Sequence, residues 1–305
     1  MIAAGKPTND LAVVIVSYNS SGEIVACLDS VRRAHSDLTI EVWVVDNNSS
    51  DGTVVIVSSF YPEVRLIAND ANMGFPKANN QAIRQIESPY ILLLNPDTVV
   101  APNALRALVS FMIAHPECGV CGPQLYDADG VQAPDLRAPN SWRYLLALTP
   151  FVRTQNLNNE EQEAISGAGL LFRRSLVNDV GLLDETLFWA EDLDFCCRAL
   201  RKGYRICKVS DASVIHFCGR STTSNFEGKM YTRQVTLIRL INKHYGGLQR
   251  WSLLSVAVLE IMLRATKWTV VRWMRPSLEA DSRFRGLRRA IRELPRLIHA
   301  GGDPA

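Results

Sequence analysis

The sequence has 305 residues, of which 47% are hydrophobic and 21% charged, as is typical of a folded globular protein that buries a sizeable core. The most apolar segment of the chain, residues 251–274, is interrupted by charged residues. Its longest uncharged run has nine residues and ends at Leu259, which is too short for a membrane-spanning helix. The formal net charge is +2, but residues 243–299 hold 12 Lys/Arg and 4 Asp/Glu, whereas residues 1–242 hold 21 and 26. A basic tail on an acidic body favours an anionic partner, either lipid headgroups or nucleic acid.

The first half of the chain alternates short apolar runs with segments of helical periodicity. Residues 11–16 form a continuous apolar run, which predicts a strand buried on both faces. Strands are also expected at residues 41–45, 64–68 and 90–94, and helices at residues 20–33, 54–60 and 79–86. This alternation predicts a parallel sheet covered by helices.

Polar side chains follow these predicted strands closely. The residues concerned are Ser17, Tyr18, Asn19, Asp46, Asn47, Asn95 and Asp97. In open sheets with parallel strands, ligands bind beyond the carboxyl ends of the strands. We therefore expect these side chains to gather at one edge of the sheet.

The second half is less regular. The sequence predicts a turn at residues 127–130, an amphipathic helix at residues 192–202, and strands at residues 166–172, 204–209 and 214–216. The strand at 166–172 begins with small residues, which suits the floor of a cleft. Seven cysteines lie mostly in apolar runs, and the single Cys-x-x-Cys at Cys118 and Cys121 has no partner motif for zinc. We therefore interpret them as buried structural thiols.

Five titratable residues are candidates for binding or catalysis. Asp46 could accept an N–H group of a base or bind ribose hydroxyls, although a strand-end Asp is as often a turn residue. Asp97 offers hard oxygen ligands for Mg²⁺ or Mn²⁺, and His216 is a second candidate ligand, although a lone histidine is more often a core residue. Glu191 or Asp192 could accept a proton at a helix start, although this pair is also ordinary capping.

Taken in order, several stretches resemble glycosyltransferase family 2, the inverting enzymes with the GT-A fold. They are VVIVSYNS at residues 13–20, VVDNNSSDGT at 44–53, NMGFPKANN at 72–80, LLLNPDT at 92–98, GLLDE at 181–185 and AEDLD at 190–194, followed by His216. The resemblance covers about residues 11–222. It implies an α/β fold of GT-A type, with a Rossmann-like, mostly parallel central sheet flanked by helices. We expect this domain at residues 1–242 and a basic amphipathic helical tail at residues 243–305.

The resemblance also implies roles for single residues. Asp46 would contact the nucleotide base, Asp97 and His216 would bind a divalent cation, Mg or Mn, and Asp192 would be the catalytic base with Glu191 beside it. The residues expected to bind the nucleotide sugar are Ser17, Tyr18, Asn19, Asp46, Asn72, Gly74, Asn80 and Asn95. The reaction would move a sugar from a nucleotide diphosphate to an acceptor hydroxyl, with inversion.

One position departs from the family pattern. The first carboxylate of the metal-binding Asp-x-Asp is Asn95 here, and an amide coordinates a metal more weakly. This departure favours an alternative, a catalytically degenerate GT-A scaffold or binding subunit of a polysaccharide assembly complex. The Asn-Pro-Asp-Thr form is similar to the rhamnosyltransferase branch. That branch implies dTDP-rhamnose or a UDP-sugar as donor and a lipid-linked or glycan acceptor.

The tail contains an apolar segment broken by Glu260, Arg264, Lys267 and Arg272. This pattern fits an interfacial helix, a helix packed on the protein itself, or a dimer contact. The basic amphipathic residues 283–296 favour an anionic membrane surface, bound through residues 251–296. Nucleic acid is not expected, because the body shows no basic face, and neither a dinucleotide nor a P-loop fingerprint occurs. Residues 1–10 lack a signal-peptide core, so we expect a cytoplasmic protein at the inner face of the membrane.

Overall fold

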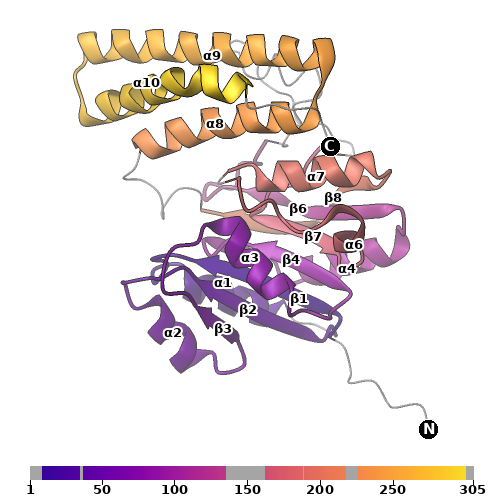
Figure 1. The fold of residues 1–305 in the computed structure, drawn as a ribbon. Helices are drawn as coiled ribbons and strands as arrows, with labels where there is room; N and C mark the ends of the chain where they lie inside the picture. The colour runs from indigo at the N-terminus through magenta and orange to yellow at the C-terminus, as the bar shows by residue number, and fades with distance from the viewer. Residues whose placement is uncertain (1–8, 35–36, 135–161, 188, 218–225, 300–305) are drawn as a thin grey trace. The chain divides into compact units, whose positions relative to one another are not determined.

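The protein is described by a computed structural model that covers residues 9–34, 37–134, 162–187, 189–217 and 226–299 (Figure 1). The described residues form two compact units. The first contains the residues up to 186 together with 191–217, and the second contains residues 226–299 and the short segment 187–190. Residue 243, where the sequence suggested a boundary, lies near the end of a helix of the second unit.

The first unit is built on one eight-stranded sheet. Its strands are β1 (Leu11–Ser17), β2 (Ile40–Asp46), β3 (Arg65–Ala68), β4 (Tyr90–Leu94), β5 (Thr98–Val100), β6 (Cys118–Tyr126), β7 (Gly169–Arg173) and β8 (Arg205–His216). The order is β3-β2-β1-β4-β7-β6-β8-β5. Strands β3, β2, β1 and β4 are parallel, so their carboxyl ends meet at one edge. Because β7 is antiparallel to β4, β7 begins at that same edge.

Helices cover both faces of this sheet. They are α1 (Ile24–Arg33), α2 (Thr53–Phe60), α3 (Phe75–Ile83), α4 (Ala104–Ala114), α6 (Leu176–Val180) and α7 (Glu191–Arg201). The predicted α/β fold with a mostly parallel sheet is confirmed. Helix α3 begins at Phe75, four residues before the prediction, because Pro76 suits a first helical turn and Gly74 takes a φ of +82°.

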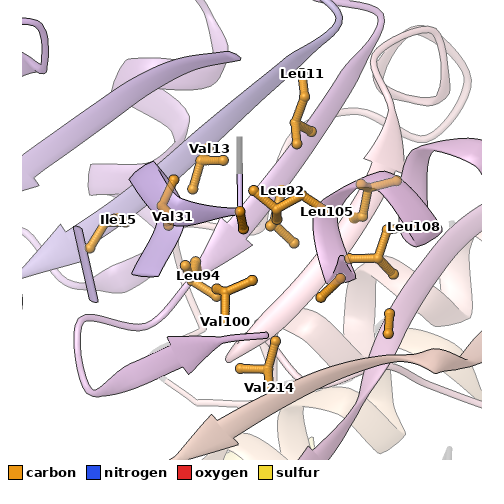
Figure 2. Close-up of a cluster of buried hydrophobic side chains, with 14 of the residues drawn as sticks. Leu11, Val13, Ile15, Val31, Leu92, Leu94, Val100, Leu105, Leu108 and Val214 are labelled. Carbon is orange, nitrogen blue, oxygen red and sulfur yellow. The ribbon is translucent and has the colours of Figure 1, made fainter. Parts of the chain in front are cut away.

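The core explains why the first predicted strand is apolar throughout. Leu11, Val13 and Ile15 of β1 pack on one face of the sheet with residues of β4, α1 and α4 (Figure 2). Ala12 and Val14 point to the other face, where α3 packs against β1, and they are also fully buried. A strand with helices on both faces has no polar side, so the alternation typical of a half-exposed strand is missing.

Two predictions for the second half of the first unit are wrong in detail. The strands expected at residues 204–209 and 214–216 are one strand, β8, whose pairing with β6 is irregular between Pro123 and Gln124. Exposed Ser210 and Asp211 lie opposite that irregularity and interrupt the apolar pattern. The sequence analysis also missed β5, α4 and β6.

The described cysteines are structural thiols, as predicted. Cys27, Cys118, Cys121, Cys196, Cys197 and Cys207 are free and buried. Burial raises the pKa of Cys27 to about 12, so this thiol stays neutral and unreactive at physiological pH. The seventh cysteine, Cys218, lies outside the described residues.

The second unit is a bundle of three long helices, α8 (Phe226–His244), α9 (Gly247–Met274) and α10 (Leu278–His299) (Figure 1). Ile238 of α8, Ile261 of α9 and Leu287 of α10 belong to one buried apolar cluster. A Cβ atom added at Gly286 would lie 2.4 Å from the carbonyl oxygen of Glu227, so only glycine allows α10 to approach α8 this closely. None of the helices in the described part of the chain combines the length and apolar character needed to cross a bilayer.

Candidate active site

Asp46 lies at the carboxyl end of β2 and is held by three hydrogen bonds. The parallel register places it beside Ser17 of β1, whose hydroxyl donates to Oδ1 at 2.8 Å. The amide and hydroxyl of Ser49 donate to Oδ2 and Oδ1 at 2.8 and 2.5 Å. The carboxylate is only 1% exposed, and these donors compensate for its loss of water.

The residues after β1 form the next part of this edge. Asn19 has a φ of +51°, a left-handed conformation that asparagine tolerates better than most residues. Its side-chain oxygen accepts from the Ser50 amide at 2.8 Å, and its own amide donates to the Ser49 hydroxyl at 2.8 Å. The neighbouring Tyr18 is 44% exposed, so part of its ring is available to a ligand.

The loop before α3 is tied to the end of β2. Asn72 accepts the amide of Gly74 at 3.0 Å, which closes a tight turn. Asn47, directly after Asp46, donates to the carbonyl of Gly74 at 3.4 Å and accepts the amide of Met73 at 3.4 Å. Asn72 and Gly74 are thereby held near the end of β2.

Asn80 is placed differently from these residues. Its buried amide donates to the carbonyl of Leu183 at 2.9 Å and to Glu185 at 3.0 Å, and it accepts the amide of Leu183 at 3.1 Å. Three bonds within the protein use most of its hydrogen-bonding capacity. Asn80 therefore joins α3 to the loop at residues 181–185.

Asn95, Asp97 and His216 form one cluster although His216 is more than a hundred residues away in sequence. The cause is the antiparallel pairing of β5 with β8, which places Thr98 opposite His216. Nε2 of His216 lies 3.2 Å from Oδ1 of Asp97 and 3.3 Å from Nδ2 of Asn95. The amide of Phe217 donates to the carbonyl of Asp97 at 2.9 Å, which fixes the two segments together.

This arrangement allows either a hydrogen bond or a bound cation. If Nε2 of His216 carries a proton, it can donate to Oδ1 of Asp97; if it does not, its lone pair and that carboxylate oxygen face the same point. A divalent cation accepts lone pairs from both Nε2 and Oδ1. Adjacent ligands of an octahedral ion with bonds of about 2.1 Å lie roughly 3 Å apart, close to the separation of these two atoms.

The protein offers such an ion few ligands of its own. Among the residues that the structure describes, no group of three His, Cys, Asp or Glu side chains could hold a metal. Asp97 and His216 could supply two ligands, and Asn95 could turn its amide oxygen toward the same point. Oxygen atoms of a bound diphosphate could complete the coordination shell.

Asp192 lies in the first turn of α7 and is partly exposed. Its Oδ2 accepts the amide of Gly167 at 2.8 Å, and its Oδ1 accepts the amide of Leu193 at 2.7 Å. Removal of water raises its pKa, although the backbone hydrogen bonds act in the opposite direction. The N-terminus of α7 would by itself lower the pKa of this carboxylate and make it a weak base, but burial outweighs that effect.

Glu191 differs from Asp192 because its buried carboxylate oxygen, Oε2, accepts no hydrogen bond from a described residue. Burial, and then the charge of Asp192, raise its pKa to about 8, so Glu191 is mostly protonated at pH 7. The preceding Ala190 has a φ of +65°, which costs alanine about 1 kcal/mol and is a kind of strain often found at functional sites.

One short segment joins the acidic pair to the histidine cluster. Gly167 donates its amide to Asp192, and the next residue, Ala168, accepts the amide of Asn95 at 3.5 Å. Residue 169 then begins β7 opposite Leu94 of β4. The sheet edge therefore brings together the ends of β2, β1 and β4, the start of β7 and the start of α7.

Known proteins with similar sequences identify the family of this chain. The sequence model described as Glycosyl transferase family 2 matches residues 12–181, more than half of the chain. The chain belongs to this family. The predicted resemblance and the predicted enzyme class are confirmed: the protein is a family 2 glycosyltransferase.

The curated relatives of this glycosyltransferase include two bacterial enzymes of glycan synthesis. An N-acetylglucosaminyl-diphospho-decaprenol L-rhamnosyltransferase of Mycobacterium tuberculosis is 29% identical over 291 residues, which cover 85% of this chain and 94% of that protein. The succinoglycan biosynthesis protein ExoO of Rhizobium meliloti is 30% identical over 215 residues, covering 68% of this chain and 60% of that protein.

Solved structures support the fold of the glycosyltransferase. TarS 1–349 of S. aureus, in complex with UDP-GlcNAc, superposes with a TM-score of 0.58 at 19% identity, covering 95% of this chain and 81% of that chain. The mannosyltransferase PcManGT of Pyrobaculum calidifontis, in complex with GDP-Man and Mn²⁺, has a TM-score of 0.58 at 17% identity, covering 95% and 88%. Both similarities support the GT-A type of fold predicted from the sequence.

Sequence reasoning missed several residues that build the site of the glycosyltransferase. Ser49 holds Asp46, and Gly167 and Ala168 hold Asp192 and Asn95. Ser49 belongs to a stretch interpreted as a helix cap, so its side chain was assigned to α2. The run of small residues at 166–169 was the available signal for the second group, because backbone atoms can approach a ligand closely only where side chains are small.

A cleft lies next to this segment within the first unit. Ser166 and Gly169 line it together with Gln124, Gln162 and Lys208. Its wall is thus continuous with the segment that donates a hydrogen bond to Asp192.

Proposed function

We propose that this glycosyltransferase moves a sugar, with L-rhamnose as the first candidate, from a nucleotide diphosphate to a hydroxyl group of a lipid-linked or polysaccharide acceptor. The mycobacterial relative is named as an L-rhamnosyltransferase that acts on a diphospho-decaprenol, and this chain matches 94% of its length. The relative ExoO is named for succinoglycan biosynthesis. The donor is dTDP-rhamnose or a UDP-sugar.

The observation that carries the proposal is the segment at residues 166–169. Because Gly167 binds Asp192 and Ala168 binds Asn95, a proton acceptor and a diphosphate-binding cluster are held by adjacent residues of one strand start. Sugar transfer requires these two groups on either side of the anomeric carbon. Because one segment holds both groups, the site favours an enzyme over the catalytically degenerate scaffold that Asn95 alone would suggest.

The donor would lie along the sheet edge. In the proposal Asp46 binds the base or ribose, with Ser17, Tyr18 and Asn19 beside it. Asn72 and Gly74 line the loop near the donor, and Asn95 binds the diphosphate end. Asn80 contributes indirectly, because its side chain already bonds to the loop at residues 181–185.

The proposed chemistry is a single displacement. Asp192 takes the proton of the acceptor hydroxyl as its oxygen bonds to the anomeric carbon, and the bond from that carbon to the diphosphate oxygen breaks. Attack from the face opposite the leaving group inverts the configuration. The pKa of Asp192, raised by burial, makes it a stronger base than a solvated aspartate, and Glu191 beside it stays neutral near pH 7.

A divalent cation fits the residues on the diphosphate side. Asp97 and His216 would hold Mg²⁺ or Mn²⁺, and Asn95 lies within reach of the same point. Such an ion offsets the negative charge that gathers on the leaving diphosphate. The solved mannosyltransferase complex contains Mn²⁺, which agrees with this choice of cation.

The enzyme is also proposed to work at the inner face of the cell membrane, as a peripheral cytoplasmic protein. A lipid-linked acceptor presents its reactive hydroxyl at a membrane surface. The basic tail, which carries 12 Lys/Arg against 4 Asp/Glu between residues 243 and 299, would be attracted to anionic lipids there.

A donor screen tests the proposal. The thermal midpoint of the protein is measured with dTDP-, UDP- and GDP-sugars, with and without Mn²⁺, and transfer is then measured with the donor that binds. We expect dTDP-rhamnose or a UDP-sugar to raise the midpoint, and Mn²⁺ to increase the shift. Asp97→Ala should lose the Mn²⁺-dependent part of binding, at least about tenfold in affinity.

Glu87→Ala is the matched control, because Glu87 is exposed and lies just before β4, at the edge of the sheet opposite to the carboxyl ends of the parallel strands. It should bind the donor like the wild type. Binding that is unchanged in Asp97→Ala and insensitive to EDTA contradicts the metal role. A donor that binds but is never transferred to any acceptor favours the scaffold alternative.

A further inference from the structure

Helix α9 carries an apolar face that no described part of the protein covers. We call it the outward face of α9. Its large side chains are between 41% and 90% exposed, and they are Leu248, Trp251, Leu259, Met262, Leu263, Val270, Trp273 and Met274. Their spacings of three, four, seven and eight residues place them on one side of the helix.

The hydroxyl groups of the small polar residues on the outward face are hydrogen-bonded within the helix. The hydroxyl groups of Ser255, Thr266 and Thr269 donate to carbonyl oxygens one turn earlier in the helix, at 2.8 to 3.0 Å. Ser252 donates in the same way to the carbonyl of Gln249 at 2.8 Å. Because these hydroxyl groups already donate to helix carbonyl oxygens, the face can enter an apolar medium without leaving a hydroxyl donor unpaired.

The bundle does not use this face. Its contacts with α9 bury a different set of side chains, including Leu253, Leu254, Ala257 and Ile261. A surface helix of a soluble bundle normally needs one apolar stripe, and α9 has two. An apolar strip of this length is larger than the scattered exposed residues found on ordinary surfaces, and such patches mark interaction sites.

The exposed charges of α9 itself are cationic. Lys267 is exposed on α9 and Arg275 follows its last residue, whereas Arg272 is exposed but pairs with Asp281 of α10 at 3.5 Å. The one acidic residue of α9, Glu260, is 7% exposed and pairs with Arg264. A face bordered by exposed cations is complementary to an anionic surface, and it opposes pairing with a second copy of itself, because two copies would bring like charges together.

The tryptophans agree with a lipid surface. Trp251 and Trp273 stand near opposite ends of the helix, 52% and 85% exposed. Tryptophan favours the headgroup level of a bilayer, and two of them about 33 Å apart along the axis would both lie at the headgroup level of one leaflet if the helix were parallel to the membrane.

We propose that the outward face of α9 is the surface by which this protein lies on an anionic lipid bilayer, with the helix axis in the plane of the interface. The inference deepens the proposed function, on which the need for a membrane rests. It also changes which tail residues bind lipid: the apolar stripe of α10, including Leu287 and Leu294, is buried in the bundle, so α10 does not present it to a membrane.

Flotation of the full chain with vesicles tests the proposal. One set contains phosphatidylglycerol mixed with phosphatidylcholine, and the other contains phosphatidylcholine alone. The wild type should float with the anionic vesicles. The double variant L259S/L263S should bind them roughly tenfold less or weaker still, because two large apolar side chains no longer enter the bilayer.

The matched control is V55S/I113S. It removes two apolar side chains of the first unit that are 65% and 67% exposed, and it should float like the wild type. Equal loss in both double variants overturns the proposal, because binding would then follow total apolar surface. Lys267→Glu should reduce binding to anionic vesicles more than binding to neutral ones, and the opposite result counts against the orientation.

Two further measurements separate the possible failures. Gel filtration of the wild type and L259S/L263S shows whether the face joins two copies; a dimer that this variant dissociates, with no vesicle binding, overturns the lipid surface. Transfer to a water-soluble acceptor should be equal in both proteins. If neither protein transfers a sugar but the wild type floats, the proposed function fails and the membrane surface stands.

Discussion

The two ends of the candidate site hold their carboxylates in opposite ways. Asp46 is almost fully buried, yet three donors from Ser17 and Ser49 compensate its charge. Asp192 receives only two backbone amides, and its neighbour Glu191 has a buried oxygen with no partner among the described residues. Hydrogen-bond donors of the protein already compensate the charge of Asp46 in the absence of a ligand. The acidic pair receives fewer donors, so its charge is less well compensated.

This difference separates binding from reaction. A carboxylate that is fixed by its own protein can recognise a ligand without changing its protonation state. A carboxylate whose pKa is raised by burial can accept a proton more readily, as a general base must. The same Asp→Asn substitution at the two positions should therefore have different effects on stability, donor binding and turnover.

The largest effect is expected for Asp192→Asn. The amide has the same size but cannot take the acceptor proton, so turnover should fall by about a hundredfold to ten-thousandfold. Donor affinity, measured by titration calorimetry, should stay near that of the wild type. Asparagine leaves one of the two backbone amides of Gly167 and Leu193 without an acceptor, and removal of the desolvated charge partly offsets that loss, so the free energy of unfolding should fall by less than in Asp46→Asn. Full turnover in this variant would show that another group is the base.

Asp46→Asn should act on binding and stability instead. Asparagine has only one acceptor oxygen for the three donors of Ser17 and Ser49, so at least one donor loses its partner. We expect a loss of about 1–3 kcal/mol in the free energy of unfolding and a donor affinity at least roughly tenfold weaker. With saturating donor, turnover should remain within a few-fold of the wild type. A collapse of turnover with unchanged affinity would contradict the binding role.

The sequence predicted the strands of the parallel half well, for a physical reason. Strands that are buried on both faces, such as β1 and β4, are uninterrupted apolar runs bounded by polar residues, and such runs can be read from the sequence. The missed β5 is three residues long, and it exists because it pairs with β8 across a sequence distance that no local pattern records.

The candidate site divides in the same way. Strand ends could be read locally, so Asp46, Asn95 and Asp97 were placed at one edge. The contact of His216 with Asp97, and that of Asp192 with Gly167, depend on antiparallel pairings and on a helix start from distant parts of the chain. The sequence also does not show how deeply Asp192 is buried. For this reason its raised pKa was not expected.

A smaller effect on turnover is expected for Arg198→Lys, which tests how α7 positions the acidic pair of Glu191 and Asp192. The Arg198 guanidinium bonds to buried Asp194 at 2.9 Å and to the carbonyl oxygens of Val180 and Leu182. Lysine keeps the charge but cannot reach these acceptors together. Because Asp194 belongs to the first turns of α7, we expect turnover to fall roughly tenfold, with donor affinity nearly unchanged.

The control for this prediction is Arg201→Lys, at the exposed end of the same helix. It should leave turnover within about twofold of the wild type. A merely structural role for Arg198 would lower stability without this kinetic effect. The pH profile of turnover discriminates the two, because a displaced Asp192 should also change its apparent pKa.

The smallest effect on turnover is expected for Glu191→Gln, and this variant tests the buried carboxyl group of the acidic pair through the pH dependence of stability. The pKa of Glu191 is raised to about 8 in the folded protein, against about 4.3 in an unfolded chain. Between these values the folded protein keeps a proton that the unfolded chain has lost, so the free energy of unfolding decreases as pH rises, by at most about 1.4 kcal/mol per pH unit. Glutamine lacks this titration, so the variant should gain stability relative to the wild type from pH 5 to pH 8 in urea unfolding.

Glu185→Gln provides the opposite sign. Hydrogen bonds from Asn80 and Arg84 lower the pKa of Glu185, so its stabilising contribution is present above the unfolded value and is lost as pH falls. That variant should therefore lose stability relative to the wild type at neutral pH and approach it in acid. Parallel curves for both variants would mean that Glu191 does not carry the buried proton, and the contrast between a satisfied and an unsatisfied carboxylate at this site would fail.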